Sequence, residues 1–256
     1  MLLAIDIGNS NTVLGFYKND KIVYSHRFIT KTQITTDELK TKFFNILNFC
    51  EIDKQDLAAV FVASVVPNLN QIYADLARDY FKSDIFFVRD FSVNFPVKIQ
   101  VDNIQEVGDD RLVNVLAASR KYQDNVIIVD FGTAITFDIV TKAQGYLGGL
   151  IFPGVNLALE YFPNATAKLP KIELAFPDYI TGSNTITAMQ SGISYGYLML
   201  IEGIIHKICA EHNCKFRILA TGGMGKVFYG KSKIIEYYDA DLTLDGLNIL
   251  YKSTKN

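Results

Sequence analysis

Residues 4–12 read "AIDIGNSNT", an apolar run that carries one acid, Asp6, and then breaks into small polar residues. A buried carboxylate is costly unless it is paired or binds a metal ion. Two interpretations of this stretch are open at this point. It is either an Asp-initiated tight turn between two strands or a strand end that presents its carboxylate to a ligand.

The same pattern returns in the second half of the chain, where residues 126–136 read "VIIVDFGTAIT". At a constant offset of 124 residues the aligned pairs are Asp6 with Asp130, Gly8 with Gly132, Asn9 with Thr133 and Thr12 with Thr136. The offset is nearly half of the 256-residue length. A chance turn is not expected to recur with its acid, its glycine and its following strand in register. The recurrence therefore predicts two homologous half-domains.

The overall composition limits the classes of function. With 49% hydrophobic and 20% charged residues and a net charge of −2, the chain has the composition of a folded protein without a basic nucleic-acid-binding face. An acid at position 6 interrupts the N-terminal apolar run, and no run approaches a membrane span, so neither a signal peptide nor a membrane partner is expected. Three sparsely placed cysteines favour the reducing cytoplasm.

Each half reads as three strands followed by helices and further strands. The strand triplets are predicted at 2–7, 12–17 and 21–27, and at 126–130, 136–140 and 146–151. "TTDE" with Glu38 predicts a capping box at Thr35, and Pro67 opens a further helix.

A long helix is predicted near 185–208, and its Gly192, Gly196 and Gly203 indicate close helix packing. The fold class expected is α/β, with duplicated domains at 1–121 and 122–256 and an inter-domain cleft that binds the ligand.

The two Asp-ended strands with glycine-rich turns predict a nucleotide site. Glycines let backbone N–H groups approach an anion closely, and Asn or Thr side chains add donors. The two carboxylates can hold a divalent ion that neutralises a polyphosphate. This arrangement needs no phosphate-binding lysine.

Two other motifs are interpreted as coincidences. "GKVFYGKS" at 225–232 matches the P-loop pattern, but its interior is bulky and only 24 residues follow Ser232. "CAEHNC" at 209–214 suggests a zinc site, yet the chain has only three histidines, and we interpret the segment as a helix end that runs into a strand.

The segment "EVGDDRLVN", residues 106–114, predicts a helix that begins after Gly108 and runs to about Lys121. The helix dipole favours acids in the first turn of a helix, which accounts for Asp109 and Asp110. It disfavours a cation there, so it does not account for Arg111. A functional interpretation explains both charges. One carboxylate acts as a general base, and the arginine binds an anionic substrate.

Taken together, these blocks resemble the type III pantothenate kinases, members of the actin-like ATPase superfamily with duplicated ribonuclease-H-like domains. "DIGNSNT" resembles the first phosphate loop, "GDDR" the G-x-D-R substrate motif and "DFGTAITFD" the second phosphate loop. The blocks "GGLIFPG", "TAKLP", "NTITAMQSG" and "ATGG" follow in the family's order. The resemblance covers nearly the whole chain, and seven blocks in order are specific although each alone is weak.

The resemblance implies roles for individual residues. The implied ATP contacts are Asp6, Ile7, Gly8, Asn9, Ser10, Asn11, Thr12, Val13 and Thr133. The implied pantothenate contacts are Gly108, Asp109, Asp110, Arg111 and Thr185. Asp110 is expected to be the proton acceptor, with Asp109 solvated beside it, and Asp130 is expected to help bind K⁺ or NH₄⁺. Mg²⁺ is expected to accompany ATP.

The implied activity is the ATP-dependent phosphorylation of pantothenate to 4'-phosphopantothenate, the first step of coenzyme A biosynthesis, by a homodimer. One departure is that Val101, Asn103 and Ile104 stand where family members often have Tyr and an Asn-Pro pair. We therefore expect a pantothenate affinity that differs from the family norm.

Two alternatives are a non-enzymatic regulator, as in accessory factors of the same fold, and an actin- or chaperone-like ATPase. The intact Asp110 and Arg111 disfavour the first, and the length of 256 residues disfavours the second.

Overall fold

The structure, a computed structural model, describes residues 1–166 and 168–255; Ala167 of the "TAKLP" block and Asn256 lie outside the described residues. The chain forms two compact units. Unit 1 comprises residues 1–121 and 241–256, and unit 2 comprises residues 122–240. The division at 121/122 coincides with the expected domain boundary, whereas residues 241–255 pack with unit 1 instead of unit 2.

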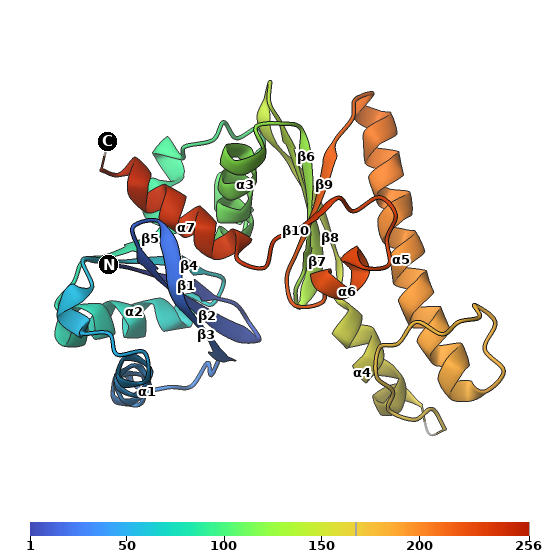
Figure 1. Ribbon diagram of the computed structural model, residues 1–256, viewed down its shortest axis with the longest axis horizontal. Helices are drawn as coiled ribbons and strands as arrows, with labels where there is room; N and C mark the ends of the chain where they lie inside the picture. Colours follow the sequence, from blue (N-terminus) through green and yellow to red (C-terminus); the bar gives the residue numbers. More distant parts are fainter. Residues whose placement is uncertain (167, 256) are drawn as a thin grey trace. The chain divides into compact units, whose positions relative to one another are not determined.

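Unit 1 is built on a five-stranded sheet in the order β3-β2-β1-β4-β5 (Figure 1). Its strands are β1 (Leu2–Ile7), β2 (Asn11–Lys18), β3 (Lys21–Ile29), β4 (Ala59–Ser64) and β5 (Ile85–Phe87). Its α-helices are α1 (Thr36–Phe49), α2 (Pro67–Leu76), α3 (Asp109–Tyr122) and α7 (Leu242–Ser253). Short helical turns are η1 (Lys54–Asp56), η2 (Ala77–Phe81), η3 (Val88–Asn94) and η4 (Ile104–Glu106).

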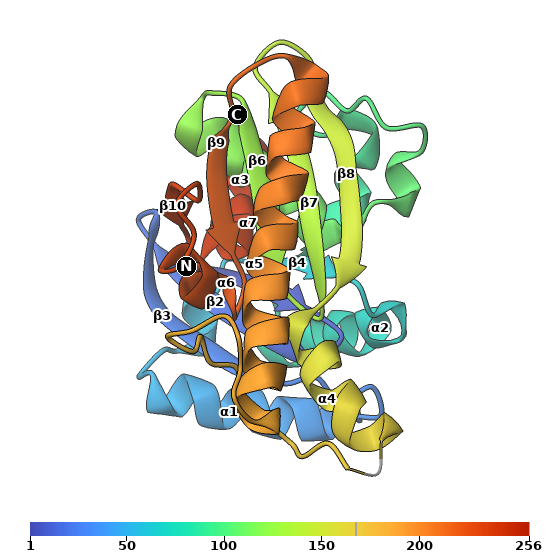
Figure 2. The same ribbon diagram turned by 90° about the vertical axis from the view of Figure 1, so that its right-hand side faces the viewer.

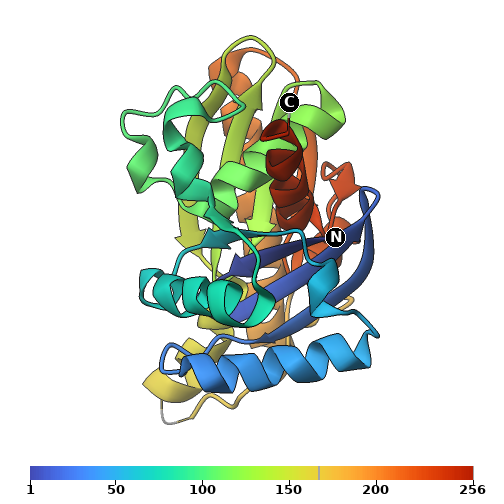
Figure 3. The same cartoon turned by 90° about the vertical axis from the view of Figure 1, so that its left-hand side faces the viewer.

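The local signals of the sequence are confirmed in unit 1. Thr35 caps α1, and the Glu38 N–H donates to Thr35 Oγ1 at 3.2 Å while the Glu38 carboxylate accepts from the Thr35 N–H at 2.8 Å. Pro67 is the first residue of α2. Leu3, Ile5 and Ile7 alternate along β1 and join the core beneath α1 and α2, which cover one face of the sheet (Figure 3).

The C-terminal helix α7 covers the other face of this sheet. It contacts β1, β2 and β4, and the Tyr251 ring meets the Phe61 ring edge-on at 5.3 Å between centroids. Gly246 lets the helix approach α3 so closely that an added Cβ would lie 2.1 Å from the Val113 carbonyl oxygen. The assignment of residues 241–256 to the second domain followed their position in the chain, but the apolar face of α7 has its partners in unit 1.

Unit 2 repeats the design around a second sheet, in the order β10-β9-β6-β7-β8. Its strands are β6 (Val126–Phe131), β7 (Ala134–Thr141), β8 (Gly145–Pro153), β9 (Arg217–Thr221) and β10 (Tyr237–Tyr238). Its helices are α4 (Val155–Ala165), α5 (Thr185–His212) and α6 (Gly225–Tyr229). The long helix α5 lies across one face of the sheet, as Figure 2 shows, and buries Ile193, Ile201 and Ile205 against it.

Duplication is confirmed by the pairing of the two sheets. The first strand of each unit pairs antiparallel with the second and parallel with the fourth. The constant offset, however, ends at the turn. Val13 pairs with Asp6, and Thr136 pairs with Asp130, so the structural equivalent of Thr12 is Ile135. The alignment of Thr12 with Thr136 is wrong because the second hairpin loop is one residue shorter.

The close packing predicted for the glycines of α5 is not made within this chain. A Cβ added at Gly192, Gly196 or Gly203 would meet no atom within 4 Å among the described residues. These positions lie on the exposed side of α5, because the helix packs on its sheet through the opposite, isoleucine-rich side. No helix in residues 1–166 and 168–255 combines the length and apolarity that a membrane span needs.

Candidate active site

The first phosphate loop connects β1 to β2 at the end of the central strand of unit 1. Asp6 is the penultimate residue of β1 and partly exposed. The Gly8 N–H donates to the Asn11 carbonyl at 3.0 Å, which closes the turn. Asn9, Ser10 and Asn11 are exposed at its tip. The loop therefore presents a carboxylate and short polar side chains at one end of the sheet, as the sequence predicted.

Thr30, just beyond β3, holds this loop from the side. Its hydroxyl donates to the Gly8 carbonyl at 2.7 Å, and its N–H donates to the Ser10 carbonyl at 3.0 Å. Thr12 is completely buried, with its hydroxyl 3.0 Å from that of Thr30. Ile7 is buried as well. The buried side chains of Thr12 and Ile7 therefore support the loop from within. Only the backbone groups of these two residues can contact a ligand.

The second phosphate loop lies at the matching end of β6 in unit 2. Asp130 is again the penultimate strand residue and partly exposed, and the Gly132 N–H donates to the Ala134 carbonyl at 3.1 Å. Thr133 is exposed at the tip. The two loops therefore have the same chemistry at equivalent positions of two sheets.

Two further glycines surround the second loop, and sequence reasoning gave neither a role. Gly222 has φ +83°, and a Cβ there would lie 2.4 Å from Asp130 Oδ1 and 2.7 Å from the Phe131 backbone. Gly154 donates its N–H to the Thr133 carbonyl at 3.1 Å, and its Cβ would lie 2.3 Å from that oxygen. The block "ATGG" thus places a glycine beside Asp130, and the block "GGLIFPG" places one beside the Gly132 and Thr133 carbonyls.

The "GDDR" segment opens α3 in unit 1, as predicted. The Leu112 N–H donates to the Gly108 carbonyl at 3.1 Å, which closes the first turn. The Asp110 carboxylate folds back over Gly108, where an added Cβ would lie 2.4 Å from Asp110 Oδ1, and it accepts from the Arg111 N–H at 2.8 Å. A side chain at position 108 would therefore clash with the Asp110 carboxylate, and the glycine avoids that clash.

Burial raises the pKa of Asp110 above its usual range, against the opposing effects of the Arg111 N–H and of the Arg111 and Arg89 guanidinium groups. A carboxylate with a raised pKa holds a proton more readily near neutral pH than an exposed one. This property suits a general base.

Asp109 does not lie where the sequence analysis expected it. The prediction of a solvated side chain is wrong, because Asp109 is 1% exposed. Its Oδ1 lies 2.6 Å from Arg89 Nε, and its Oδ2 accepts from the Ser64 N–H at 3.2 Å. Among the motif's side chains, Asp110 and Arg111 remain partly exposed for a substrate. Arg89 was missed, since only a tertiary contact links it to the motif.

Thr185, the remaining predicted substrate contact, is the first residue of α5 in unit 2 and is exposed. Asn184 caps this helix by accepting from the Thr187 N–H at 3.0 Å. The cap explains why α5 begins at Thr185, in the block "NTITAMQSG", and leaves the threonine hydroxyl at the helix N-terminus.

The P-loop match is not a phosphate loop in the structure. Residues Gly225–Tyr229 form the short helix α6 rather than an open loop. The Lys231 ammonium group lies 5.4 Å from the ring centroid of Phe176, and the Ser232 hydroxyl donates to Glu202 Oε1 at 2.7 Å.

We therefore expect Lys231→Ala to leave phosphoryl transfer nearly intact. A lysine that bound β- and γ-phosphates would stabilise transition-state charge, and its loss would lower turnover by orders of magnitude. Steady-state turnover of the purified variant checks this, with the wild-type protein measured alongside. A drop of that size in a folded variant would contradict the assignment of the phosphate loops.

"CAEHNC" also has the structure that its interpretation required. α5 runs to His212, Asn213 follows in the left-handed conformation, and β9 begins at Arg217. All three cysteines of the chain are free thiols. No group of three or more His, Cys, Asp or Glu side chains suited to a metal ion occurs in residues 1–166 and 168–255.

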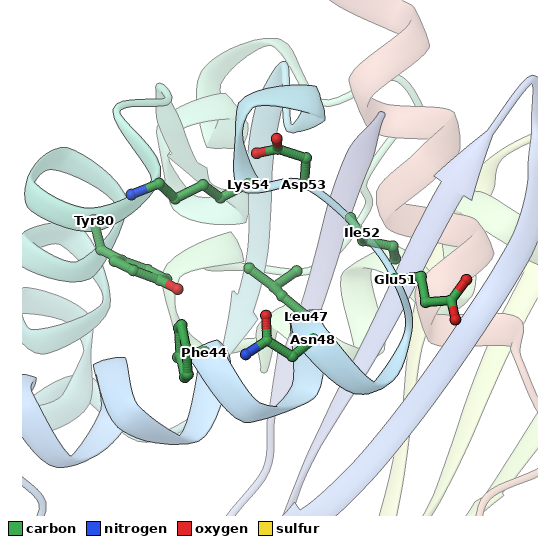
Figure 4. Close-up of a pocket in the computed structure, with 8 residues that line it drawn as sticks. All are labelled: Phe44, Leu47, Asn48, Glu51, Ile52, Asp53, Lys54 and Tyr80. Atoms are coloured by element: carbon green, nitrogen blue, oxygen red, sulfur yellow. The ribbon is translucent and has the colours of Figure 1, made fainter.

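A pocket of about 450 Å³ opens in unit 1 away from these loops (Figure 4). It lies around the C-terminal end of α1, η1 and the η2 residue Tyr80. Figure 4 shows Lys54 reaching toward the Tyr80 ring, and its ammonium lies 4.8 Å from the ring centroid. None of the predicted site residues lines this pocket.

Comparison with known proteins agrees with the family resemblance and with the fold. The profile of the family described as type III pantothenate kinase matches residues 2–207. A type III pantothenate kinase from Paramagnetospirillum magneticum is 42% identical over 247 residues, which cover 96% of this chain and 95% of that protein.

Solved structures extend the likeness of the fold. A protein of the Baf family of transcriptional activators from Campylobacter jejuni superposes with a TM-score of 0.60 at 20% identity, covering 99% of this chain and 100% of that one. A 2-dehydro-3-deoxygalactonokinase from Sinorhizobium meliloti gives a TM-score of 0.62 at 12% identity, covering 99% and 96%. At these identities the structures show the duplicated ribonuclease-H-like fold alone. The full-length sequence match goes further, and it shows that the chain belongs to the type III pantothenate kinase family.

Proposed function

We propose that this protein transfers the γ-phosphoryl group of ATP to pantothenate and forms 4'-phosphopantothenate, the first step of coenzyme A biosynthesis. The observation that carries the proposal is the 42% identity to a type III pantothenate kinase over 96% of the chain. The "GDDR" site supports it independently, because it offers a half-buried carboxylate with a raised pKa directly beside an arginine. In phosphoryl transfer to an alcohol such a carboxylate orients the hydroxyl and accepts its proton, and an arginine beside it can hold an anionic substrate.

The nucleotide is proposed to contact both phosphate loops. In the first loop the contacts are Asp6 to Val13, with Asn9, Ser10 and Asn11 contributing exposed donors. In the second loop the contact is Thr133. Backbone N–H groups in glycine-containing turns suit phosphate oxygens because no side chain blocks their approach.

Catalysis is proposed to depend on alignment and on charge. Asp110 accepts the proton of the primary alcohol of pantothenate as its oxygen attacks the γ-phosphorus. Arg111 binds the pantothenate carboxylate, a pairing that planar guanidinium groups make with two parallel hydrogen bonds. Thr185 supplies a further hydroxyl contact. Asp109, buried against Arg89, is left out of the direct contacts.

The residues around Asp130 fit a monovalent cation. The Asp130 carboxylate lies against Gly222, where no side chain intervenes, and the carbonyl oxygens of Gly132 and Thr133 in the same loop face Gly154. One carboxylate with backbone carbonyls is an all-oxygen donor set that suits a hard cation of low charge. Asp130 would hold K⁺ or NH₄⁺ there, and Mg²⁺ would accompany ATP; both cations would supply positive charge to the phosphates.

We expect activity to depend on K⁺ or NH₄⁺ and to be weak in Na⁺ alone. The partly exposed Asp130 carboxylate and the backbone carbonyls of its loop supply the oxygen donors proposed for that cation. Asp130→Asn should lose the cation response together with most of the activity. Turnover measured in matched potassium, ammonium and sodium chloride checks this, and equal rates in sodium and potassium would contradict it.

The central test is whether purified protein forms ADP only when pantothenate is present. A pantothenate-dependent signal supports the kinase. ADP formed without any alcohol would indicate an actin- or chaperone-like ATPase, and no ADP under any condition would favour the catalytically silent regulator. A small panel of other alcohols measures selectivity in the same assay.

We further propose that the protein is a cytoplasmic homodimer. Exposed apolar side chains on α5 and on the two elements that contact it, β8 and α4, support a partner surface: Ile151 of β8, Leu157 and Tyr161 of α4, and Met199 of α5. Apolar patches of this kind mark protein contacts. Light scattering coupled to size-exclusion chromatography should give twice the chain mass.

A further inference from the structure

One arginine outside the predicted site binds the segment that leads into the "GDDR" motif. Arg89 lies in η3 and makes three contacts. Its Nη1 donates to the Ile104 carbonyl at 3.1 Å, its Nη2 donates to the Val107 carbonyl, and its Nε lies 2.6 Å from Asp109 Oδ1. A single planar guanidinium therefore holds the η4 turn and the first residue of α3 together.

The partner carboxylate connects the motif to the first phosphate loop of the same unit. Asp109 Oδ2 accepts from the N–H of Ser64, the last residue of β4. Ser64 pairs with Ile7 across the β1–β4 ladder, and the Val65 N–H donates to the Ile7 carbonyl at 3.0 Å. The contacts thus run from Arg89 through Asp109 to the strand end that carries Gly8.

A helix-dipole role alone does not account for this arrangement. An acid in a first helical turn can remain exposed, whereas Asp109 is 1% exposed, and burial raises its pKa while Arg89 opposes that shift. Burying a charged pair is often no better for stability than packing apolar side chains in the same place. The pair is therefore better explained by the position that it imposes than by the stability that it adds.

We propose that Arg89 and Asp109 form a positioning pair that holds Asp110 and Arg111 in place relative to the first phosphate loop. Asp110 is the next residue along α3, so a shift of the helix start moves its carboxylate by a similar distance. A misplacement of about 1 Å can lower the rate about 100-fold. This proposal rests on the proposed kinase function for its kinetic readout.

The experiment compares Arg89→Met, Asp109→Asn and the double variant Arg89→Met/Asp109→Asn. For each, kcat per folded protein, KM for ATP and pantothenate, and Tm are measured. We expect kcat to fall about 10- to 100-fold in Arg89→Met with KM for ATP nearly unchanged. In the double variant Tm should recover, because no buried charge is left unpaired. Its kcat should stay low, because the contacts to the Ile104 and Val107 carbonyls are still missing.

A purely structural role would give a different result. Arg89→Met would then lower Tm alone with kcat near that of the wild type, or the double variant would regain wild-type kcat; either outcome would overturn the proposal. Arg78→Met is the matched control, since Arg78 pairs with two carboxylates of the same unit at an exposed site. It should leave kcat and both KM values unchanged.

Failure of the kinase assignment is distinguishable from failure of this proposal. If the wild type forms no pantothenate-dependent ADP, the proposed function fails, and hydrogen–deuterium exchange then tests the pair without substrate. Amides of residues 104–112 should exchange faster in Arg89→Met than in Arg78→Met. Equal exchange in the two variants would refute the positioning pair.

Discussion

Asp110→Asn is expected to lower turnover about 100-fold or more while pantothenate still binds, because a general base contributes rate enhancement of this size. Asparagine keeps the shape of the side chain above Gly108 but cannot accept the proton of the attacking alcohol. Arg111 and Thr185 are unchanged, so substrate affinity should largely survive. Turnover and calorimetric titration with pantothenate measure the two effects separately.

The same substitution should raise Tm at pH 7. Burial raises the pKa of Asp110 in the folded protein, so the folded state binds this proton more tightly than the unfolded chain does. The stability that this group contributes is present at low pH and is lost as pH rises through its raised pKa. A neutral asparagine avoids that loss, and the advantage should shrink as the wild type is titrated toward pH 4.

The raised pKa of Asp110 also predicts how kcat/KM of the wild type falls at low pH. The base must be deprotonated, so activity should rise with pH through an apparent pKa above that of an ordinary aspartate. Asp102→Asn, an exposed acid in the preceding segment, is the control and should leave turnover and Tm unchanged. An active Asp110→Asn enzyme would show that the base is misassigned.

Gly222→Ala is expected to destabilise the protein by about 3 kcal/mol or more and to abolish activity, since strain and a steric clash combine. The residue has φ +83°, where a side chain is strained, and an added Cβ would lie 2.7 Å from the Phe131 backbone. Its other close neighbour is Asp130 Oδ1 at 2.4 Å. Thermal unfolding should show a large fall in Tm, and any folded fraction should respond poorly to potassium.

Gly230→Ala provides the matched control in the same unit. The Cβ there would lie 3.6 Å from the Lys226 and Val227 carbonyl oxygens, an ordinary contact distance, and φ is −71°. Alanine should therefore stabilise the protein by about 0.4–1 kcal/mol, because it restricts the unfolded chain. Equal Tm values for the Gly222→Ala and Gly230→Ala variants would contradict the packing described around Asp130.

The parts of the fold that depend on residues adjacent along the chain were predictable from the sequence. The strand triplets, the capping box at Thr35 and the helix start at Pro67 depend on periodicity and local hydrogen bonds, and each lies where it was predicted. The duplication was visible because its acid and glycine recur at one offset. The offset does not hold beyond the turn, because pairing with β6 rather than spacing along the chain determines the place of Thr136.

The sequence by itself determined the fold class, the two Asp-ended strands with their glycine turns and the "GDDR" helix start, because each depends on residues adjacent along the chain. Only the tertiary structure decided how far the two acids of the "GDDR" motif are buried and what they contact. Asp109 is buried through Arg89 and Ser64, which lie 20 and 45 residues before it, and the printed sequence contains no signal for that pairing. It likewise decided that α7 packs with unit 1, since the apolar face of a helix does not specify which sheet will bury it.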